Sequence, residues 1–473
     1  MALPHYERLS HLDASFLALE SRETHMHVAG VGVFEAGPLE GPDGGIDIDA
    51  VRAHVESKLP YIPRYRQRLA FVPLERSPVW VDEEHFNLDY HVRHTSLPRP
   101  GNEAQLKRLA ARICSQQLDR AKPLWELWVV EGLESDRFAL IGKIHHSMID
   151  GISGVDLLAI LLNVAPTGER EDAPEWRPRP VPTGSQLLIS EAAKATRRGI
   201  DTLTHAGDLL QDGRSVIGDL VRKLEAARQS LSSGWLTPAS KTPLNRPIGP
   251  NRRFEWTELS LADVKSVRAN LGGSINDVVL GTVAGALRHF FLEHRGFPVD
   301  HLEYRVMAPV SVRTADQRGA LGNQVAMWLV QMPLAEPDPT ARLRAVQEIT
   351  RSLRRTDQAL GASTLVQLSA GAPTTLVSLG ARLAADAYRP FNMTVTNVPG
   401  PQFPMYLLGS RMLAQYPIVP LWAQHGLGIA LFSYDGRLLW GLQADWDAVP
   451  DFPDFIESIH RSFRELQQAA GAG

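Results

Sequence analysis

Two proline-rich stretches divide this chain, and they constrain its fold more than any other feature of the sequence. Residues 166–182 are rich in proline, glutamate and arginine, and residues 238–250 form a second proline-rich break. Such composition is typical of connecting segments rather than of helix or strand interiors. The chain has 473 residues, which is too long for one ordinary hydrophobic core. The sequence therefore predicts two domains and a connecting segment.

Strands and helices alternate on both sides of these breaks. In the first half we expect strands at residues 27–34, 125–131 and 137–144, and helices at 49–58 and 104–118. The turn residues between the last two strands predict a hairpin. In the second half we expect helices and strands in the following ranges: helices 263–270, 276–294 and 452–469, and strands 304–312, 393–398, 429–434 and 438–445.

This pattern predicts an α/β protein with three parts. Residues 1–180 would form an N-terminal lobe, 181–248 a helical linker, and 249–473 a C-terminal lobe. Within the linker, residues 186–229 carry apolar side chains at helical spacing and are predicted to form two helices. Their charges are mixed, without a dense basic face. We therefore expect a packed helical hairpin, with a membrane-facing patch as the alternative.

Composition narrows the classes of function. The formal net charge is -4, which does not favour a nucleic-acid partner. Cys114 is the only cysteine, so no internal disulfide can form, and its place in an apparent helix predicts a buried thiol. The first residues contain no apolar signal core, and no apolar run approaches the ~20 residues that span a bilayer. We expect a cytoplasmic protein that is soluble or lies peripherally at a membrane surface.

The run from His145 to Gly151 carries the chemistry. It follows a predicted strand and precedes an apolar helix, and sites in open α/β sheets are built at such strand ends. Adjacent residues of an extended segment face opposite ways, so only one of His145 and His146 can point into a given cleft. This argues against a metal site and for a single general base. Asp150 could orient the base or hold the turn through an arginine, and Gly151 permits a tight turn.

Several other segments accompany this motif in order along the chain. They are residues 9–16, residues 26–28, Pro123-Leu124-Trp125, residues 274–280, residues 309–313 with 322–323, and residues 397–401. The His-His-x-x-x-Asp-Gly run resembles the signature of the chloramphenicol-acetyltransferase-like acyltransferases. With the other segments, the chain resembles the bacterial wax ester synthase/acyl-CoA:diacylglycerol acyltransferase family over nearly its whole length.

The resemblance implies two lobes of mixed sheets and helices that meet at a substrate tunnel. It implies that long-chain acyl-CoA is a substrate, so that no cofactor is needed, and that diacylglycerol or a long-chain fatty alcohol is the acceptor. His146 would be the base, His145 and Asp150 would complete the motif, and Arg313 would pair with Asp150. The implied location is the inner face of the cell membrane or a lipid inclusion.

The remaining candidates also have structural interpretations. Ser274 and Asp277 have the spacing of a helix N-cap and its partner. Asn276, in the same first turn, is a candidate donor to an oxyanion. Pro123-Leu124-Trp125 is predicted to pack rather than to react.

Three alternatives stay open at this point. His145 and Asp150 also fit the His-x-x-x-x-Asp motif of glycerol-phosphate acyltransferases, although the accompanying Pro-Glu-Gly-Thr block is missing. A condensation-domain-like enzyme with another acceptor shares the seven-residue motif. A non-catalytic protein that binds lipid droplets could retain the same residues.

Overall fold

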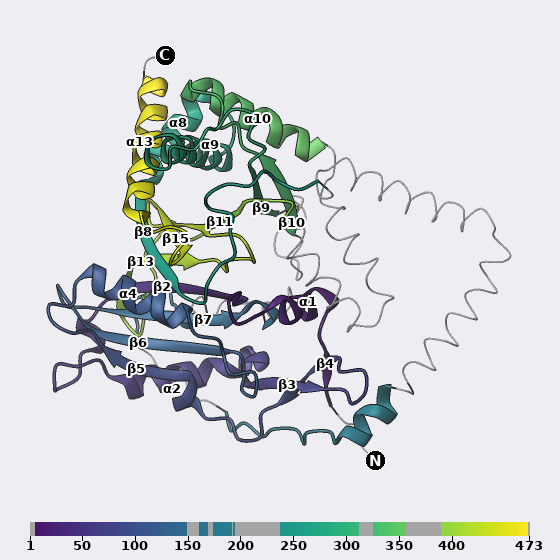
Figure 1. Cartoon of the computed structure of the whole chain (residues 1–473). Helices are drawn as coiled ribbons and strands as arrows, with labels where there is room; N and C mark the ends of the chain where they lie inside the picture. Colours follow the sequence, from purple (N-terminus) through teal and green to yellow (C-terminus); the bar gives the residue numbers. More distant parts are fainter. Residues whose placement is uncertain are drawn as a thin grey trace, which may run out of the picture.

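The computed structural model describes seven parts of the chain, namely residues 5–148, 160–168, 174–191, 193, 237–311, 325–355 and 389–471. Within them, two six-stranded mixed sheets form the centres of two lobes, and a smaller three-stranded sheet lies beside the first (Figure 1). The predicted α/β class with two mixed-sheet lobes is confirmed.

The first lobe is built on the sheet β12-β13-β2-β7-β6-β5. Strand β2 (His27–Glu35) pairs with β7 (Arg137–His145), and β7 pairs with β6 (Trp125–Leu133) in the predicted antiparallel hairpin. Strand β5 (Val92–Ser96) lies parallel to β6 at the edge. The predicted helices are α2 (Ile48–Lys58) and α4 (Glu103–Cys114).

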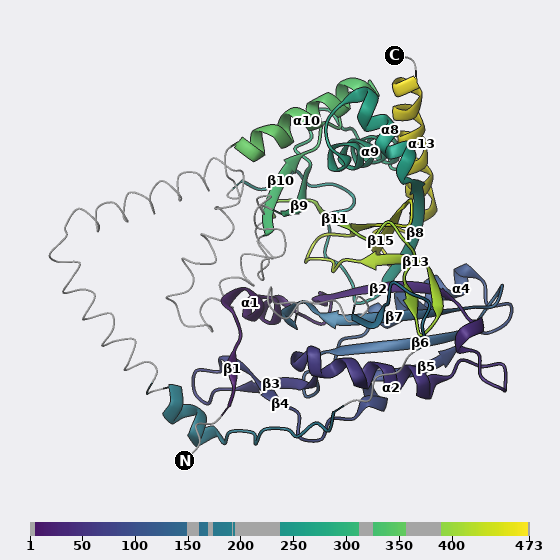
Figure 2. The ribbon, with the colours of Figure 1, turned by 180° about the vertical axis from the view of Figure 1, so that it is seen from behind.

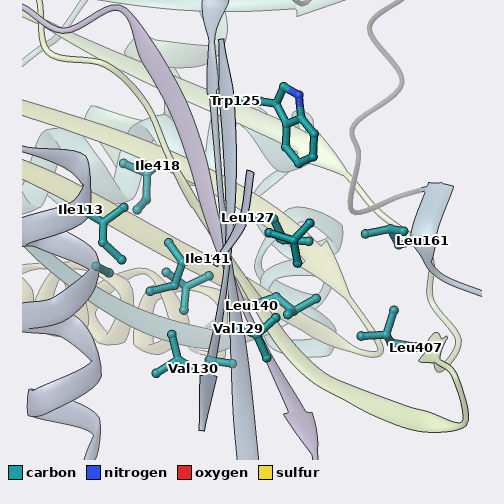
Figure 3. Packing of buried hydrophobic residues seen from close by; sticks show 14 of the residues in the cluster. Ile113, Trp125, Leu127, Val129, Val130, Leu140, Ile141, Leu161, Leu407 and Ile418 are labelled. Atoms are coloured by element: carbon teal, nitrogen blue, oxygen red, sulfur yellow. The ribbon is translucent and has the colours of Figure 1, made fainter. Parts of the chain in front are cut away.

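Both faces of this sheet are packed with apolar side chains. Ile113 of α4 lies on one side with Val130, and Leu127 and Leu161 lie on the other (Figure 3). All four side chains are at most 2% exposed. A strand buried on both faces is apolar throughout rather than alternating, which is why β6 and β7 are recognisable in the sequence.

The second lobe is built on the sheet β10-β9-β11-β14-β15-β8, with its helices gathered on one face (Figure 1). The four strands predicted for the second half are confirmed as β9, β11, β14 and β15. Three further elements of this lobe, β8, β10 and α10, were not predicted. The bounds are β8 (Arg252–Ser260), β9 (Arg305–Ser311), β10 (Val325–Gln331), β11 (Met393–Pro399), β14 (Leu427–Tyr434), β15 (Arg437–Asp445), α8 (Leu261–Leu271), α9 (Ile275–His289), α10 (Pro339–Arg355) and α13 (Phe452–Gly471).

One segment of the second half belongs to the first sheet. Strands β12 (Tyr406–Leu407) and β13 (Ser410–Ile418) lie at its edge, where β13 pairs antiparallel with β2. A Cβ on Gly441 of β15 would lie 1.7 Å from the carbonyl oxygen of Pro417, so β13 and β15 pass in close contact. These two strands lie within the range predicted for the C-terminal lobe, 249–473, but they belong to the sheet of the first lobe. Pairing between distant strands leaves no local sequence pattern, which explains the difference.

The first proline-rich stretch, residues 166–182, is docked where the structure describes it. Arg179 donates to both carboxylate oxygens of Asp82, from Nε at 2.9 Å and from Nη2 at 2.8 Å. Asp82 ends β4 (Pro78–Asp82), which lies between β1 (Glu7–Arg8) and β3 (Gln67–Phe71) in the small sheet. The end of this proline-rich stretch thus packs against the small sheet of the first lobe (Figure 2).

Two further predictions concern the remaining helices and the cysteine. Residues 184–191 are helical, but most of the predicted helical hairpin at 186–229 lies outside the described residues. Among the helices that are described, none combines the length and apolar character needed to cross a bilayer. Cys114 is buried, as predicted, and burial raises the pKa of its thiol to about 11.

Candidate active site

The His-His segment lies where β7 ends and a short 3-10 turn, η4 (His146–Met148), begins. Two neighbouring strands hold this junction through the backbone. The N–H of His145 donates to the carbonyl oxygen of Leu124 at 3.0 Å, and the N–H of His146 donates to that of Met26 at 2.8 Å. The Pro-Leu-Trp and Met-His segments therefore support the turn directly, although they lie far from it in sequence.

His146 is packed against an aromatic ring of helix α1 (His11–Leu19). Its imidazole stacks on Phe16 with ring centroids 3.9 Å apart and 27° between the planes. Trp422, from the second half of the chain, also lies near Phe16, with ring centroids 6.3 Å apart. The Nδ1 atom of His146 is buried and makes no hydrogen bond to another residue in the described part of the chain.

This environment keeps His146 neutral. Burial lowers the pKa of its imidazole to about 4, opposed by a hydrogen bond with its own backbone. At neutral pH the ring is therefore unprotonated, and one of its nitrogens can accept a proton. A general base needs this state before the reaction begins.

His145 has entirely different partners. Its Nδ1 accepts a hydrogen bond from the N–H of Ser147 at 3.1 Å and lies 2.7 Å from the hydroxyl of that serine. Its Nε2 lies 3.7 Å from Oε1 of Glu20. The side chain is buried, and burial lowers its pKa to about 3. The two histidines thus share no partner, which agrees with the expected opposite orientation of adjacent side chains.

The Pro-Leu-Trp segment packs as predicted. Trp125 is 1% exposed, stacks on His91 with centroids 4.6 Å apart, and donates its indole N–H to the carbonyl oxygen of Tyr65 at 2.8 Å. Pro123 and Leu124 are also buried. The segment anchors the start of β6, from which the carbonyl of Leu124 reaches His145.

The predicted cap at the start of α9 is confirmed. The N–H of Asp277 donates to Oγ of Ser274 at 3.2 Å, and the N–H of Ser274 donates to Oδ2 of Asp277 at 2.7 Å. Asp277 is 4% exposed and its other oxygen accepts a hydrogen bond from the hydroxyl of Thr350 at 2.7 Å. With the hydroxyl of Ser274, which donates to Oδ2 at 2.8 Å, three donors satisfy this buried carboxylate. Asp277 thus has a structural role that the sequence predicted only in part.

Asn276 contacts Asn397, which belongs to the motif segment 397–401. Its Oδ1 accepts a hydrogen bond from Nδ2 of Asn397 at 2.7 Å, so its own Nδ2 is left to donate elsewhere. Both asparagines line a small cavity of about 20 Å³ that is partly open to solvent, together with Trp328 and Arg354. No contact among the described residues joins Asn276 to His146, since the two lie in different lobes.

Three predicted residues lie outside the described residues, namely Asp150, Gly151 and Arg313. The pairing of Asp150 with Arg313 therefore stays a prediction. Within the described ranges, no group of histidine, cysteine and acidic side chains has the arrangement of a metal site.

Sequence reasoning missed a buried polar group behind the histidines. Glu20 lies one helical turn after Phe16, and its side chain is 2% exposed. It contacts Arg120, His27 and His145. The only signal for it was its spacing from Phe16, because a single glutamate at a helix end is ordinarily solvated.

Comparison with known proteins agrees with the site. Residues 9–279 match the wax ester synthase/diacylglycerol acyltransferase catalytic domain, and residues 321–467 match the WS/DGAT C-terminal domain. The chain is 33% identical over 460 residues to the "Probable diacyglycerol O-acyltransferase tgs1" of Mycobacterium tuberculosis (strain CDC 1551 / Oshkosh), with 97% of this chain and 95% of that protein covered. It is 32% identical over 473 residues to the "Probable diacyglycerol O-acyltransferase tgs2" of that strain, covering 97% and 98%.

Solved structures give the same result for the fold. The wax ester synthase/diacylglycerol acyltransferase from Marinobacter aquaeolei VT8 superposes with a TM-score of 0.67 at 26% identity, covering 98% of this chain and 100% of that one. The first condensation domain of the CDA synthetase shares the fold at 15% identity with a TM-score of 0.57, covering 99% and 97%. The match of two family domains and of relatives over nearly their whole length shows that the chain belongs to the wax ester synthase/diacylglycerol acyltransferase family of acyltransferases.

Proposed function

We propose that this protein transfers a long-chain acyl group from acyl-CoA to the free hydroxyl of diacylglycerol, forming triacylglycerol. A long-chain fatty alcohol is a second acceptor, which gives a wax ester. The observation that carries the proposal is the neutral, half-buried imidazole of His146 directly after β7. The family and the names of the relatives support the acceptor class, and acyl-CoA as the donor follows from the resemblance of the sequence to that family.

In this mechanism, His146 accepts the proton of the acceptor hydroxyl as its oxygen attacks the thioester carbonyl of acyl-CoA. A tetrahedral oxyanion forms, and its collapse breaks the carbon–sulfur bond. The protonated His146 then gives its proton to the departing CoA thiolate. Both substrates are bound at once and no acyl-enzyme forms, which agrees with the burial and the raised pKa of Cys114.

The apolar surface near His146 suits long acyl chains. Met307, Leu329 and Phe391 form a small buried cluster, with Trp422 packed against it. Met307 lies between Val306 and Ala308, which belong to the core under the helices, so Met307 faces the other side of the sheet. The cluster continues through Trp422 and Phe16 to His146. We assign this surface to the wall of the substrate tunnel.

Asn276 is our candidate for stabilising the oxyanion. Its Nδ2 is the amide donor that the bond from Asn397 leaves available, and it lies in the first turn of α9, where the helix dipole favours negative charge. Substitution Asn276→Ala is expected to lower kcat by about 10²-fold, because one oxyanion donor is worth roughly that much.

Thr350→Val is a matched control for Asn276→Ala, because it removes a hydrogen bond to the neighbouring Asp277 without touching the amide. This control is expected to lower the free energy of unfolding and to leave kcat within a factor of about two. Equal kcat values for Asn276→Ala and the wild type would remove Asn276 from the mechanism.

The proposed acceptors partition into membranes and lipid droplets, so the protein is expected to work in peripheral contact with one of these. The same proposal places it in the cytoplasm, at the inner face of the cell membrane or on lipid inclusions. Binding to vesicles that contain diacylglycerol, measured by flotation, tests this part separately from catalysis.

The experiment that tests the activity is an acceptor panel. Purified protein is given palmitoyl-CoA with a diacylglycerol, with hexadecanol or with an amino acid amide, while CoA release is followed and products are identified by mass. We expect triacylglycerol from the first acceptor and palmityl palmitate from the second. An amide product alone would favour a condensation-type reaction. Lipid binding without CoA release from any mixture would favour a non-catalytic protein.

A further inference from the structure

We infer that Glu20 is a positioning residue: its buried carboxylate holds His145 so that the turn after it presents His146 to the substrates. The inference rests on the proposed role of His146 and adds a residue that neither the motif nor the family match assigns. It is carried by the contacts of Glu20, by the hydrogen bonding of His145 and by the backbone bonds of the turn.

The carboxylate of Glu20 is divided between two sets of partners. Its Oε2 accepts hydrogen bonds from the guanidinium of Arg120, with Nε at 2.9 Å, and the same guanidinium also donates to the carbonyl oxygen of Leu17 at 2.8 Å. Its Oε1 faces two imidazoles, with Nε2 of His27 at 3.2 Å and Nε2 of His145 at 3.7 Å. One acidic group therefore joins α1 to the beginning of β2 and the end of β7.

The hydrogen bonding of His145 fixes which nitrogen carries its proton. A backbone N–H can only donate, so Nδ1 of His145 must be unprotonated to accept from Ser147 at 3.1 Å. In a neutral ring the proton then lies on Nε2, which faces Oε1 of Glu20. Nε2 of His145 makes no other hydrogen bond in the described part of the chain, and the other imidazole near Oε1 of Glu20 is that of His27, with Nε2 at 3.2 Å. The attraction between Nε2–H of His145 and Oε1 of Glu20 in a buried environment selects this tautomer and this orientation of the ring.

The orientation of His145 matters because its ring supports the turn that contains His146. The N–H of Ser147 has the ring of His145 as its acceptor, and Ser147 is 1% exposed, so no solvent is available to replace that acceptor. On the other side, the N–H of His146 is bound by Met26, next to His27 in the sequence. Rotation of His145 would leave a buried N–H unsatisfied and allow the turn to shift.

The charge of Glu20 is stable over the working pH range. Burial by itself raises the pKa of its carboxyl, but the adjacent imidazole of His27 and the charges of His145 and Arg120 together lower it to about 2. Arg120 balances this charge, so the group adds no net charge beneath the two histidines. A carboxylate that is ionised and paired with an arginine can orient an imidazole without itself taking part in proton transfer.

The test compares Glu20→Gln with the wild-type protein in the palmitoyl-CoA and diacylglycerol assay. Glutamine keeps the size of the side chain but carries no negative charge. It therefore attracts Arg120 and the Nε2–H of His145 less strongly than the carboxylate does. We expect kcat to fall about ten- to hundredfold, because small displacements of a catalytic group have effects of this size. The KM for palmitoyl-CoA is expected to stay within a factor of about two, since Glu20 does not touch the substrate.

Glu126→Gln is the matched control. Glu126 is also buried, at 6% exposure, and is paired with Lys143 at 3.4 Å and Arg93 at 3.2 Å. It tests the general effect of removing a buried carboxylate from the same lobe. We expect Glu126→Gln to lower the melting temperature at least as much as Glu20→Gln while kcat stays within a factor of about two.

A double-mutant cycle with His145→Asn tests whether Glu20 acts through His145. If it does, the double variant loses no more kcat than His145→Asn alone, since the contact is already gone. Additive losses would overturn the inference, and so would a Glu20→Gln enzyme with wild-type kcat. The inference would also be overturned if Glu126→Gln lost as much kcat as Glu20→Gln while the two variants had the same melting temperature.

An independent readout separates this inference from the proposed function. Nitrogen NMR of labelled histidine is expected to show the Nε2–H tautomer for His145, assigned by its disappearance in His145→Asn, and mixed tautomers in Glu20→Gln. This result does not depend on turnover. If the wild-type protein transfers no acyl group, the proposed function fails while the tautomer shift can still be observed. A tautomer unchanged in Glu20→Gln would contradict the inference even if the enzyme is active.

Discussion

The variant His146→Ala is expected to lose acyl transfer from palmitoyl-CoA to diacylglycerol by a factor of about 10²–10⁴, which is the usual contribution of a general base. The physical reason is that the pKa of the His146 imidazole, about 4, leaves it unprotonated at neutral pH. The ring stacks on Phe16, and its Nδ1 makes no hydrogen bond to another of the described residues. The measurement is kcat and KM for palmitoyl-CoA, by CoA release.

The fold is expected to survive this substitution. The side chain of His146 makes a ring contact with Phe16, whereas the turn itself is held by backbone bonds to Met26 and Leu124. We expect the melting temperature of His146→Ala to lie within about 4 °C of the wild type. His85→Ala serves as the exposed control and should retain full activity. Near-wild-type turnover by a folded His146→Ala protein would remove His146 from the mechanism.

The second large effect is loss of stability in mild acid. Burial lowers the pKa of His91 to about 4 and that of His425 to about 4, whereas an unfolded histidine titrates near 6.5. The folded protein therefore resists protonation between these values while the unfolded chain takes up protons. Stability is complete above the unfolded pKa and is lost as pH falls from about 6.5 toward about 4.

The size of this loss is considerable. Each of these two groups contributes roughly 3 kcal/mol over that window, because one unit of pKa corresponds to about 1.4 kcal/mol. Burial also lowers the pKa of His27, His145 and His146. Since native domains are stable by about 5–15 kcal/mol, unfolding is expected before pH 4 is reached. The measurement is urea unfolding at pH 8, 6.5, 5.5 and 4.5.

One variant isolates a single contribution. His91 donates from Nδ1 to the carbonyl oxygen of Trp125 at 2.8 Å, and asparagine can keep that bond without titrating. His91→Asn should therefore reduce the difference in unfolding free energy between pH 8 and pH 4.5 by roughly 2–3 kcal/mol. His85→Asn, at an exposed position, should leave that difference unchanged. An identical acid dependence for His91→Asn and the wild type would contradict the account.

The parts of the fold that sequence could predict are those with a local pattern. Strands β6 and β7 are apolar runs on either side of a turn, and α9 begins with a recognisable cap. Strand β13 is different, because its place beside β2 depends on a pairing across almost 400 residues of chain. Its close passage by Gly441 is likewise visible only in three dimensions.

The candidate site divides in the same way. His145 and His146 could be found because they lie together at a strand end, and the capping role of Asp277 followed from its spacing to Ser274. The carbonyl of Leu124 that holds His145 could not be inferred, because backbone contacts carry no side-chain signature. The carboxylate of Glu20 escaped notice for a related reason: burial, which makes it significant, is a property of the folded chain.

Direct transfer through His146 is tested most directly by one mass-spectrometric experiment. Purified protein is mixed with palmitoyl-CoA, first alone and then with diacylglycerol, and the intact protein and the extracted lipids are weighed in both mixtures. We predict that the mass of the protein never changes and that triacylglycerol forms only when diacylglycerol is present, with His146→Ala forming none. A protein that gains one palmitoyl group in the absence of acceptor, and passes it to diacylglycerol when that is added, would contradict the mechanism.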